Sequence, residues 1–415
     1  MQAIKWATLI FGALFVVVVA GAINAPHLYY MAAILITLPA ISYLLGFLSL
    51  YRLTLTREIP SSAWAGEVGE LHYVVENPTK VARYFLSCRE PLPDWITPFS
   101  EMPLLFNVAP NTTSRIAYRL NLLRRGVYGM EGFDVVAMDP LGVFSFKRSI
   151  LSQTELVVYP TPQQLSHWQM EGAERNGWQE FTLLALHGNS VDPDGVRQYV
   201  PGDPLRRIHW RQTARTGQLS VIEFEESQSI QVYMILDQQK GYDFGSGVDT
   251  SFEYAVRFCA SVAWEAIHQN TSAKLIVLGE DGEPQLDTST QSRNELQLVR
   301  ILESLARVEA QGTKPIAHIT HDLAGAIPSG NTLIVVTSHA DMELGEALLL
   351  HRAGGITPIV VFVDTASFRE QSSAAVVSVP EAFEQRIRAA GAALFVVQKH
   401  AEGGLYPEGV HHGDG

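Results

Sequence analysis

The chain has 415 residues, more than one hydrophobic core usually organises, so two or three domains are expected. Hydrophobic residues make up 47%, charged residues 18%, and the formal net charge is −13. This acidic balance argues against nucleic acid or anionic lipid headgroups as the main partner of the whole chain, unless a local basic patch overrides it. The two cysteines, Cys88 and Cys259, exclude a disulfide framework and fit a reducing compartment.

Two apolar runs open the chain. No Asp, Glu, Lys or Arg occurs from Trp6 to Tyr51, and the run is interrupted at residues 24–27, a short polar turn with a proline. The stretches 6–23 and 28–51 are each close to the ~20 residues that a helix needs to cross a bilayer. Residues 1–51 therefore predict a transmembrane helical hairpin in contact with membrane lipid.

The flanking charges predict the orientation of this hairpin. Lys5 precedes the first run and Arg52 and Arg57 follow the second, whereas the turn has no Lys or Arg. The positive-inside rule then predicts two spans in a bacterial inner (cytoplasmic) membrane, with the bulk of the chain in the cytoplasm. The alternative is a cleaved signal peptide, since Ala20-Gly21-Ala22 resembles an A-x-A site, and it leaves the second span oriented in the same way.

Residues 52–160 are rich in short runs of β-branched and aromatic residues, such as 71–76, 115–120 and 156–159. Turn signals at 76–78, 109–111 and 139–142 separate such runs. Frequent short strands without helical periodicity predict a β-sandwich domain. Two strings within it, 124–129 (RRGVYG) and 139–144 (DPLGVF), have the residues of tight turns or bulges, and the second is either hairpin geometry or a docking loop.

A connector, residues 161–229, contains the most informative string of the chain. Asp203 followed by Pro204 is typical of a helix start, and Gly217 of a helix end. Within the expected helix Arg207, Arg211 and Arg215 recur every four residues and so share one face.

This arginine face has two main interpretations. It can bind phosphate or the acidic face of a partner. It can also form an internal ion-pair latch with Asp203 and with Glu223, Glu225 and Glu226, which lie on or just after an expected strand at 220–224. A catalytic role is the third reading.

The connector resembles the signature of the DUF58 family, R-x-Y-x-P-G-D-x-x-R-x-I-x-W-x-x-x-A-R. The matching residues are Arg197, Tyr199, Pro201, Gly202, Asp203, Arg206, Ile208, Trp210, Ala214 and Arg215. Family members also carry a membrane hairpin, a β-rich region and strings similar to 124–128 and 139–144. The resemblance implies a von Willebrand A-like domain and partnership with MoxR-type AAA+ ATPases and transglutaminase-like membrane proteins. The candidate partner-binding residues are Arg197, Tyr199, Gly202, Asp203, Arg206, Arg207, His209, Trp210, Arg211 and Arg215.

Residues 230–400 alternate between expected strands and helices. The strands are 231–236, 274–278, 332–337, 357–363 and 393–397, and the helices are 251–268, 292–307, 342–352 and 381–390. Such alternation predicts a Rossmann-type α/β domain with a mostly parallel sheet between two helical layers. The Gly-rich tail, residues 401–415, is expected to be disordered.

Ligands of such folds bind at the carboxyl ends of strands, so Asp237, after the first strand, is the candidate position. By resemblance, a von Willebrand A metal site has D-x-S-x-S there, but Gln239 and Gly241 replace both serines, and Lys240 adds positive charge. Because Mg²⁺ prefers carboxylate and hydroxyl oxygens, Asp237 marks a degenerate metal site, and neither a metal nor another cofactor is expected.

No phosphate-binding loop, H-E-x-x-H or G-x-S-x-G string is present. His318, His321 and Asp322 are read as a surface loop rather than a metal cluster, and Cys259 as a core residue. The leading hypothesis is therefore a non-enzymatic membrane-anchored adaptor. The alternatives are a metal-dependent protein-binding module centred on Asp237, and an undetected hydrolase using His209, Asp203 or the 318–322 group.

Overall fold

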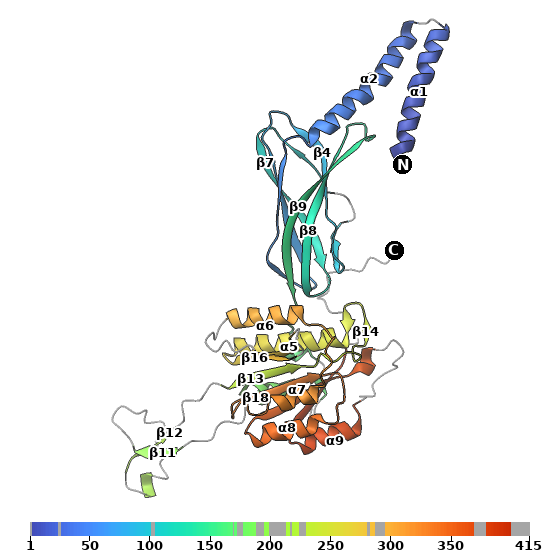
Figure 1. The fold of residues 1–415 in the computed structure, drawn as a ribbon. Helices are drawn as coiled ribbons and strands as arrows, with labels where there is room; N and C mark the ends of the chain where they lie inside the picture. Colours follow the sequence, from blue (N-terminus) through green and yellow to red (C-terminus); the bar gives the residue numbers. More distant parts are fainter. Residues whose placement is uncertain are drawn as a thin grey trace. The chain divides into compact units, whose positions relative to one another are not determined.

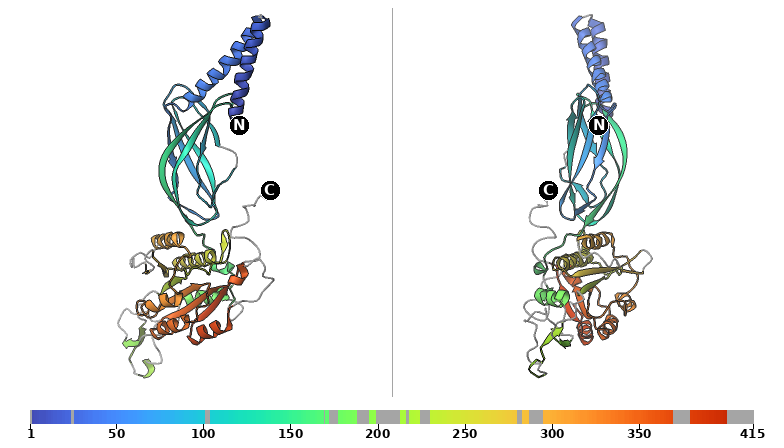
Figure 2. Two further views of the ribbon diagram at one scale, coloured as in Figure 1. Left: turned by 45° about the vertical axis from the view of Figure 1, so that its right-hand side comes forward. Right: turned by 90° about the vertical axis from the view of Figure 1, so that its left-hand side faces the viewer.

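The structure, a computed structural model, describes residues 2–23, 26–100, 104–168, 170–171, 177–187, 195–198, 213–215, 218–223, 230–279, 283–286, 295–368 and 379–399. The chain divides into two compact units, Met1–Tyr159 and Pro160–Gly415. Figures 1 and 2 show the elements of each unit.

Two apolar helices, α1 (Gln2–Ile23) and α2 (Pro26–Ser49), begin the first unit. Pro26 occupies the first position of α2, where its missing N–H costs nothing, and Pro39 lies inside the helix. Helix α2 is long and apolar enough to cross a membrane, and the described part of α1 includes a shorter apolar stretch at Ile10–Ile23. The two apolar runs expected from the sequence are thus helical.

The rest of the first unit consists of two β-sheets. Apart from the parallel pairing of β2 with β9, neighbouring strands are antiparallel. The four-stranded sheet has the order β1 (Thr54–Glu58), β3 (Val68–Asn77), β7 (Thr112–Leu122), β5 (Ile96–Pro98). The five-stranded sheet has the order β2 (Ser62–Trp64), β9 (Ser145–Tyr159), β8 (Gly126–Met138), β4 (Arg83–Arg89), β6 (Leu104–Val108).

A single hydrophobic cluster joins the two sheets. Successive side chains of a strand point to opposite faces, and in β3 Leu71, Tyr73 and Val75 are buried while their neighbours are less so. They pack with residues from the other sheet, such as Phe133 of β8 and Val158 of β9. Both sheets therefore contribute side chains to one buried cluster.

A buried ion pair crosses this core. Arg57 of β1 and Glu90, just after β4, are in direct contact, and both side chains have an exposed fraction of 0%. The guanidinium also donates to the carbonyl of Met130 (3.1 Å) and the hydroxyl of Thr154 (2.6 Å), and Tyr73 donates to the second Glu90 oxygen at 2.6 Å. Burial lowers the pKa of Arg57. These hydrogen bonds offset part of the cost of burying the two charges, and among the described residues Arg57 Nε has no partner.

The β8–β9 hairpin packs against α2. Its tip, residues 139–144, is closed by hydrogen bonds from Asp139 N to Phe144 O (3.1 Å) and from Gly142 N to Asp139 O (2.9 Å). Ser42 of α2 donates to the Asp139 carboxylate, and a Cβ at Gly46 would lie 2.7 Å from the Phe146 ring. The DPLGVF string therefore forms a hairpin turn, the first of its two predicted interpretations. This turn also contacts α2.

The second unit is built on a seven-stranded sheet of order β10-β20-β19-β18-β13-β16-β17. The five strands from β20 to β16 are parallel, and β17 and β10 pair antiparallel at the edges. The strand bounds are β10 (Met170–Glu171), β13 (Gln231–Leu236), β16 (Ser272–Leu278), β17 (Pro284–Leu286), β18 (Thr332–Thr337), β19 (Thr357–Val363) and β20 (Ala393–Val397).

Helices cover both faces of this sheet (Figure 1). Helices α5 (Ser251–His268) and α6 (Glu295–Arg307) lie on one face, and α7 (Ile316–Asp322), α8 (Leu344–Ala353) and α9 (Glu381–Ala389) on the other. The central strands are apolar and buried throughout, as expected for a sheet covered on both faces. Cys259 of α5 is 0% exposed, which confirms it as a core residue, and burial raises its pKa to about 12.

Smaller elements complete the second unit. They are the helical segments η1 (Leu165–His167), α3 (Gly177–Thr182), η2 (Leu183–His187) and η4 (Thr365–Phe368), and the two-stranded pairs β11 (Gly195–Gln198) with β12 (Ser220–Glu223) and β14 (Gly245–Ser246) with β15 (Asp249–Thr250).

Most strands and helices expected in residues 230–400 are confirmed to within a few residues. The reading of His318, His321 and Asp322 as a surface loop is wrong: all three lie on helix α7, which begins after Pro315. Proline at this point favours a helix start, but with seven residues α7 is too short to give a clear periodic pattern.

Candidate functional site

The strand order places a candidate site between β13 and β18. From β13 the chain proceeds outward through β16 to β17, then returns to the other side of β13 as β18 and continues outward to β20. β13 and β18 are parallel, but the chain adds strands outward in opposite directions from them. Ligands of open α/β sheets bind in the crevice outside the carboxyl ends of the strands at such a point. Asp237 follows β13 and Thr337 ends β18, so both lie at this edge.

The Asp237 carboxyl group is buried and hydrogen-bonded within the protein. Oδ2 lies 2.7 Å from the Thr337 hydroxyl, and Oδ1 accepts the Gln239 N–H at 3.0 Å. Burial raises the pKa of Asp237, and the hydrogen bonds from Thr337 and Gln239 oppose this shift without cancelling it. The site thus favours the protonated carboxyl more than water does.

The Thr337 hydroxyl also contacts the backbone of His339. It lies 3.0 Å from the carbonyl of His339 and also accepts the His339 N–H at 3.0 Å. A hydroxyl carries one proton, so Thr337 donates either to Asp237 or to the His339 carbonyl at any one time.

The oxygen atoms near Asp237 do not fit a divalent cation. Ser338 donates its hydroxyl to the carbonyl of Tyr242 at 2.9 Å. Asp341, the nearest acid after β18, accepts the N–H groups of Ala317 (3.2 Å) and Glu343 (3.0 Å), which lie near the starts of α7 and α8. Mg²⁺ requires ionised and freely presented oxygens, whereas these are engaged with the protein. In the described ranges no group of three His, Cys, Asp or Glu side chains could hold a metal.

The loop after β13 is fixed to a distant segment. Gln239 forms an isolated parallel bridge with Gly312, and Gly312 N–H donates to Gln238 O at 2.8 Å. A Cβ at Gly312 would lie 3.0 Å from that carbonyl, so glycine permits the close approach. Gln238 Nε2 and Gln239 Oε1 are buried and have no hydrogen-bond partner among the residues that the structure describes. They are the polar atoms of this loop with hydrogen-bonding capacity left.

An aromatic pair forms part of the rim of this edge. The rings of Tyr242 and His339 stack with centroids 3.7 Å apart and an interplanar angle of 25°. Both residues are half-buried, and Met342 nearby is 39% exposed. Aromatic and methionine side chains are enriched in protein interfaces. The rim thus presents two stacked rings and a partly exposed methionine.

The arginine signature is described only in part. Arg197 lies on β11 opposite Val221 of β12, and Arg215 ends a short helical stretch at 213–215 and is exposed. Tyr199, Gly202, Asp203, Arg206, Arg207, His209, Trp210 and Arg211 lie outside the described residues. The choice between a partner-binding face and an internal latch stays a prediction.

The group at residues 318–322 forms surface ion pairs. Lys314 lies 2.8 Å from Asp322 and 3.2 Å from Glu283, and His318 lies 3.5 Å from Glu343. The hydrogen bond from Lys314 lowers the pKa of Asp322. With Asp322 engaged by lysine, the group offers no set of converging ligands.

Two long-range hydrogen bonds were not predicted from the sequence. The pairing of Asp237 with Thr337 joins residues 100 positions apart, and that of Ser42 with Asp139 joins residues 97 positions apart. The first contact could have been predicted, because Thr337 ends the strand that an α/β topology places beside β13. The second has no local signal, because a serine in an apolar helix does not specify its partner.

Residues 195–339 match the family model described as "Protein of unknown function DUF58", which supports membership of that family. "Uncharacterized protein YeaD" of Bacillus subtilis (strain 168) is 28% identical over 166 residues, 40% of this chain and 39% of the relative. "Uncharacterized protein Rv1480" of Mycobacterium tuberculosis (strain ATCC 25618 / H37Rv) is 29% identical over 82 residues, 20% of this chain and 26% of the relative. The chain therefore spans about two fifths or less of the length of these relatives.

The solved structures with detected similarity are distant. A cohesin module from Clostridium perfringens has a TM-score of 0.16 at 14% identity, over 26% of this chain and 98% of the module. Trypsin-activated alpha-2-macroglobulin from Escherichia coli has a TM-score of 0.22 at 12% identity, over 72% of this chain and 21% of that protein. At these TM-scores the similarities carry no argument about fold or function.

Proposed function

We propose, taking membership of the DUF58 family as the premise, that this protein is a non-enzymatic adaptor anchored in the cytoplasmic membrane. Its α/β unit presents the carboxyl edge of the sheet to a protein partner, by family resemblance a MoxR-type AAA+ ATPase. The observation that carries this proposal is the state of Asp237. The residue occupies the usual ligand position of the fold, yet its oxygens are engaged by Thr337 and Gln239.

Membrane anchoring is supported by the length and apolar character of α2. The further assignment of two spans is supported by α1, whose 22 residues extend about 33 Å, close to the thickness of a bilayer core. Lys5 and Arg52 flank the pair and favour a cytoplasmic location for the residues that follow.

A von Willebrand A-like assignment of the second unit, and a sandwich assignment of the β-sheets, belong to the same proposal. The first is supported by the order of the strands, in which β17, the third strand of the sheet counted from β13, is an antiparallel edge. The second is supported by the cluster that both sheets share.

The proposed partner surface is the rim formed by Tyr242, His339 and Met342. Affinity purification of the full chain from solubilised membranes, followed by mass spectrometry, tests it. We expect an AAA+ ATPase in the wild-type sample and its loss with Tyr242→Ala. The matched control is Trp264→Ala, because Trp264 stacks on His268 with centroids 4.4 Å apart near the far end of α5.

Each outcome bears on the proposal. Retention of the ATPase by Trp264→Ala and its loss from Tyr242→Ala support the rim as the interface. Equal retention by both variants excludes the rim as the interface. A wild-type sample without any AAA+ ATPase excludes the proposed partner.

A further inference from the structure

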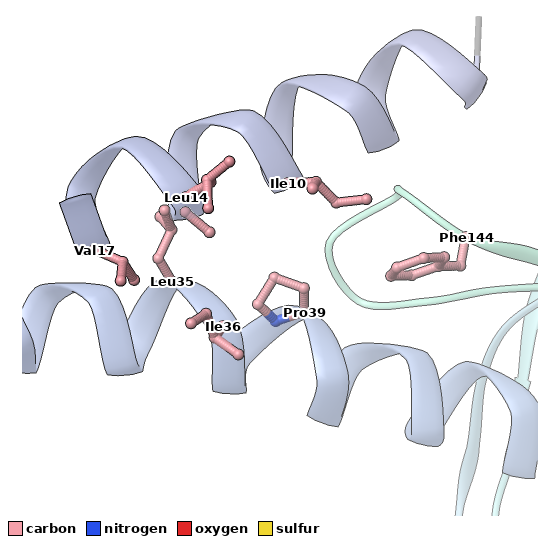
Figure 3. Close-up of a pocket in the computed structure, with 8 residues that line it drawn as sticks. Ile10, Leu14, Val17, Leu35, Ile36, Pro39 and Phe144 are labelled. Carbon is pink, nitrogen blue, oxygen red and sulfur yellow. The ribbon is translucent and has the colours of Figure 1, made fainter.

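The first unit contains an apolar cavity of about 370 Å³ between α1, α2 and the tip of the β8–β9 hairpin. Figure 3 shows side chains from both helices and Phe144 of the hairpin around it. The lining residues are all apolar: Ile10, Ala13, Leu14, Val17, Leu35, Ile36, Pro39 and Phe144.

The hairpin tip is held firmly in this position. The Phe144 ring packs edge-on against Tyr43 of α2 with centroids 5.1 Å apart, and Phe146 contacts Tyr43 (5.1 Å) and Phe47 (6.0 Å) in the same way. Ser42 donates to the carboxylate of Asp139 at the base of the turn. The wall that Phe144 contributes is therefore a fixed part of the unit.

The length of α2 places this tip within the hydrocarbon if α2 spans the membrane. Its 24 residues extend about 36 Å, against a hydrocarbon thickness of about 30 Å. Even if the whole excess protrudes at Ser49, Tyr43 lies roughly 3 Å and Pro39 roughly 9 Å inside the hydrocarbon boundary. Any tilt of α2 moves both residues deeper, and Phe144 contacts the first and faces the second.

The turn is suited to such an environment. Non-helical backbone at membrane depth must have its polar groups satisfied by protein. The Asp139 carboxylate accepts the N–H groups of Leu141 (3.1 Å) and Phe144 (2.6 Å), and the side chains that follow it at the tip include Leu141, Val143 and Phe144. The tip exposes apolar groups and keeps its carboxylate buried, at 2% exposure.

We infer that this cavity binds one acyl chain of a phospholipid, with the β8–β9 tip inserted into the leaflet beside α2. The inference rests on the proposed membrane anchoring. The cavity is continuous with the exposed apolar faces of α1 and α2, which a bilayer would cover with lipid chains. Arg52, which is exposed just beyond α2, would favour an anionic headgroup.

Photo-crosslinking of the full chain in its native membrane tests this inference. The variant Phe144→benzoylphenylalanine is expected to form a lipid adduct, identified by intact mass. Ile34→benzoylphenylalanine is the positive control, because Ile34 is 61% exposed on α2. Val68→benzoylphenylalanine is the negative control, because Val68 lies at the end of β3 remote from α2 and should form no lipid adduct.

The controls separate failure of this inference from failure of the membrane anchor. A lipid adduct at Ile34 but not at Phe144 overturns the inference and leaves the anchor standing. No lipid adduct at either position overturns both. A peptide adduct at Phe144 shows that a partner helix occupies the cavity and overturns the acyl-chain assignment.

A cavity-filling variant tests whether the lipid enters the cavity or only touches its rim. Ala13→Phe fills the cavity and should abolish the lipid adduct at Phe144, whereas Ala33→Phe adds the same ring to an exposed position of α2 and should not. An unchanged adduct in Ala13→Phe overturns the inference, because lipid then reaches Phe144 without entering the cavity.

Discussion

The Arg57–Glu90 pair provides a quantitative test of the β unit. Glu90→Ala removes the carboxylate and leaves the Arg57 guanidinium buried without a counter-charge. Breaking a fully buried ion pair on one side costs about 3–5 kcal/mol of unfolding free energy. The loss should lie in this range because both side chains are fully buried and Tyr73 also loses its acceptor.

The matched control is Glu58→Ala on the neighbouring residue of β1. Glu58 pairs with Arg115 at 2.9 Å, but the two side chains are 55% and 62% exposed. Exposed pairs contribute about 0–1 kcal/mol, so this variant should be close to wild type. The two variants remove the same chemical group from the same unit and differ in the burial of that group.

Hydrogen-exchange mass spectrometry of the solubilised full chain, in increasing urea, gives the unfolding free energy from peptides of β3 and β7. We expect those peptides to lose protection at much lower urea in Glu90→Ala than in Glu58→Ala. The reasoning is refuted if the two variants have equal free energies of unfolding. Double replacement, Arg57→Met with Glu90→Leu, should recover part of the loss, because no unpaired charge remains.

Three further predictions concern the second unit. Because burial raises the pKa of Asp237 in the folded state, the contribution of this residue to stability is present below the unfolded pKa and is lost as pH rises through the folded pKa. The unfolding free energy of Asp237→Asn should therefore increase relative to that of wild type as pH rises from about 4 to 7. A pH-independent difference between the two unfolding free energies would contradict this. Isothermal calorimetry with Mg²⁺ should give no binding heat, whereas a heat that disappears in Asp237→Ala would restore the metal-dependent alternative. Replacement of Arg207, Arg211 and Arg215 by Glu should abolish partner capture in a chain that stays folded; unfolding would favour the internal latch, and a folded variant that still binds would exclude the helix as the interface.

The α/β unit was the most predictable part of the chain. Strands β13, β18, β19 and β20 coincide with their expected ranges because each is a continuous apolar run, rich in β-branched residues, between turn signals. The edge strand β17 was missed because its three residues have no pattern to recognise. Its antiparallel pairing depends on β16, which is a tertiary rather than a local property.

The candidate site was predictable in position but not in chemistry. The sequence places Asp237 after the first strand of the unit and shows the loss of both serines that a metal site would need. It does not show that Thr337 is hydrogen-bonded to the Asp237 carboxyl group, or that Asp341 accepts N–H groups near the starts of two helices. Those contacts depend on the register of β13 with β18, in which Leu236 pairs with Val336.

The junction between α2 and the β unit has a mechanical consequence. Arg148 of β9 donates to the carbonyls of Leu50 (3.2 Å) and Leu53 (2.6 Å), so the few residues between the helix and β1 are attached to the body of the unit. The close approach of Gly46 to Phe146 adds a second contact between the end of α2 and the β unit. If α2 spans a bilayer as proposed, a force applied to the β unit would therefore be transmitted to α2 as a tilt, and side-chain packing would set the angle between the unit and the membrane surface.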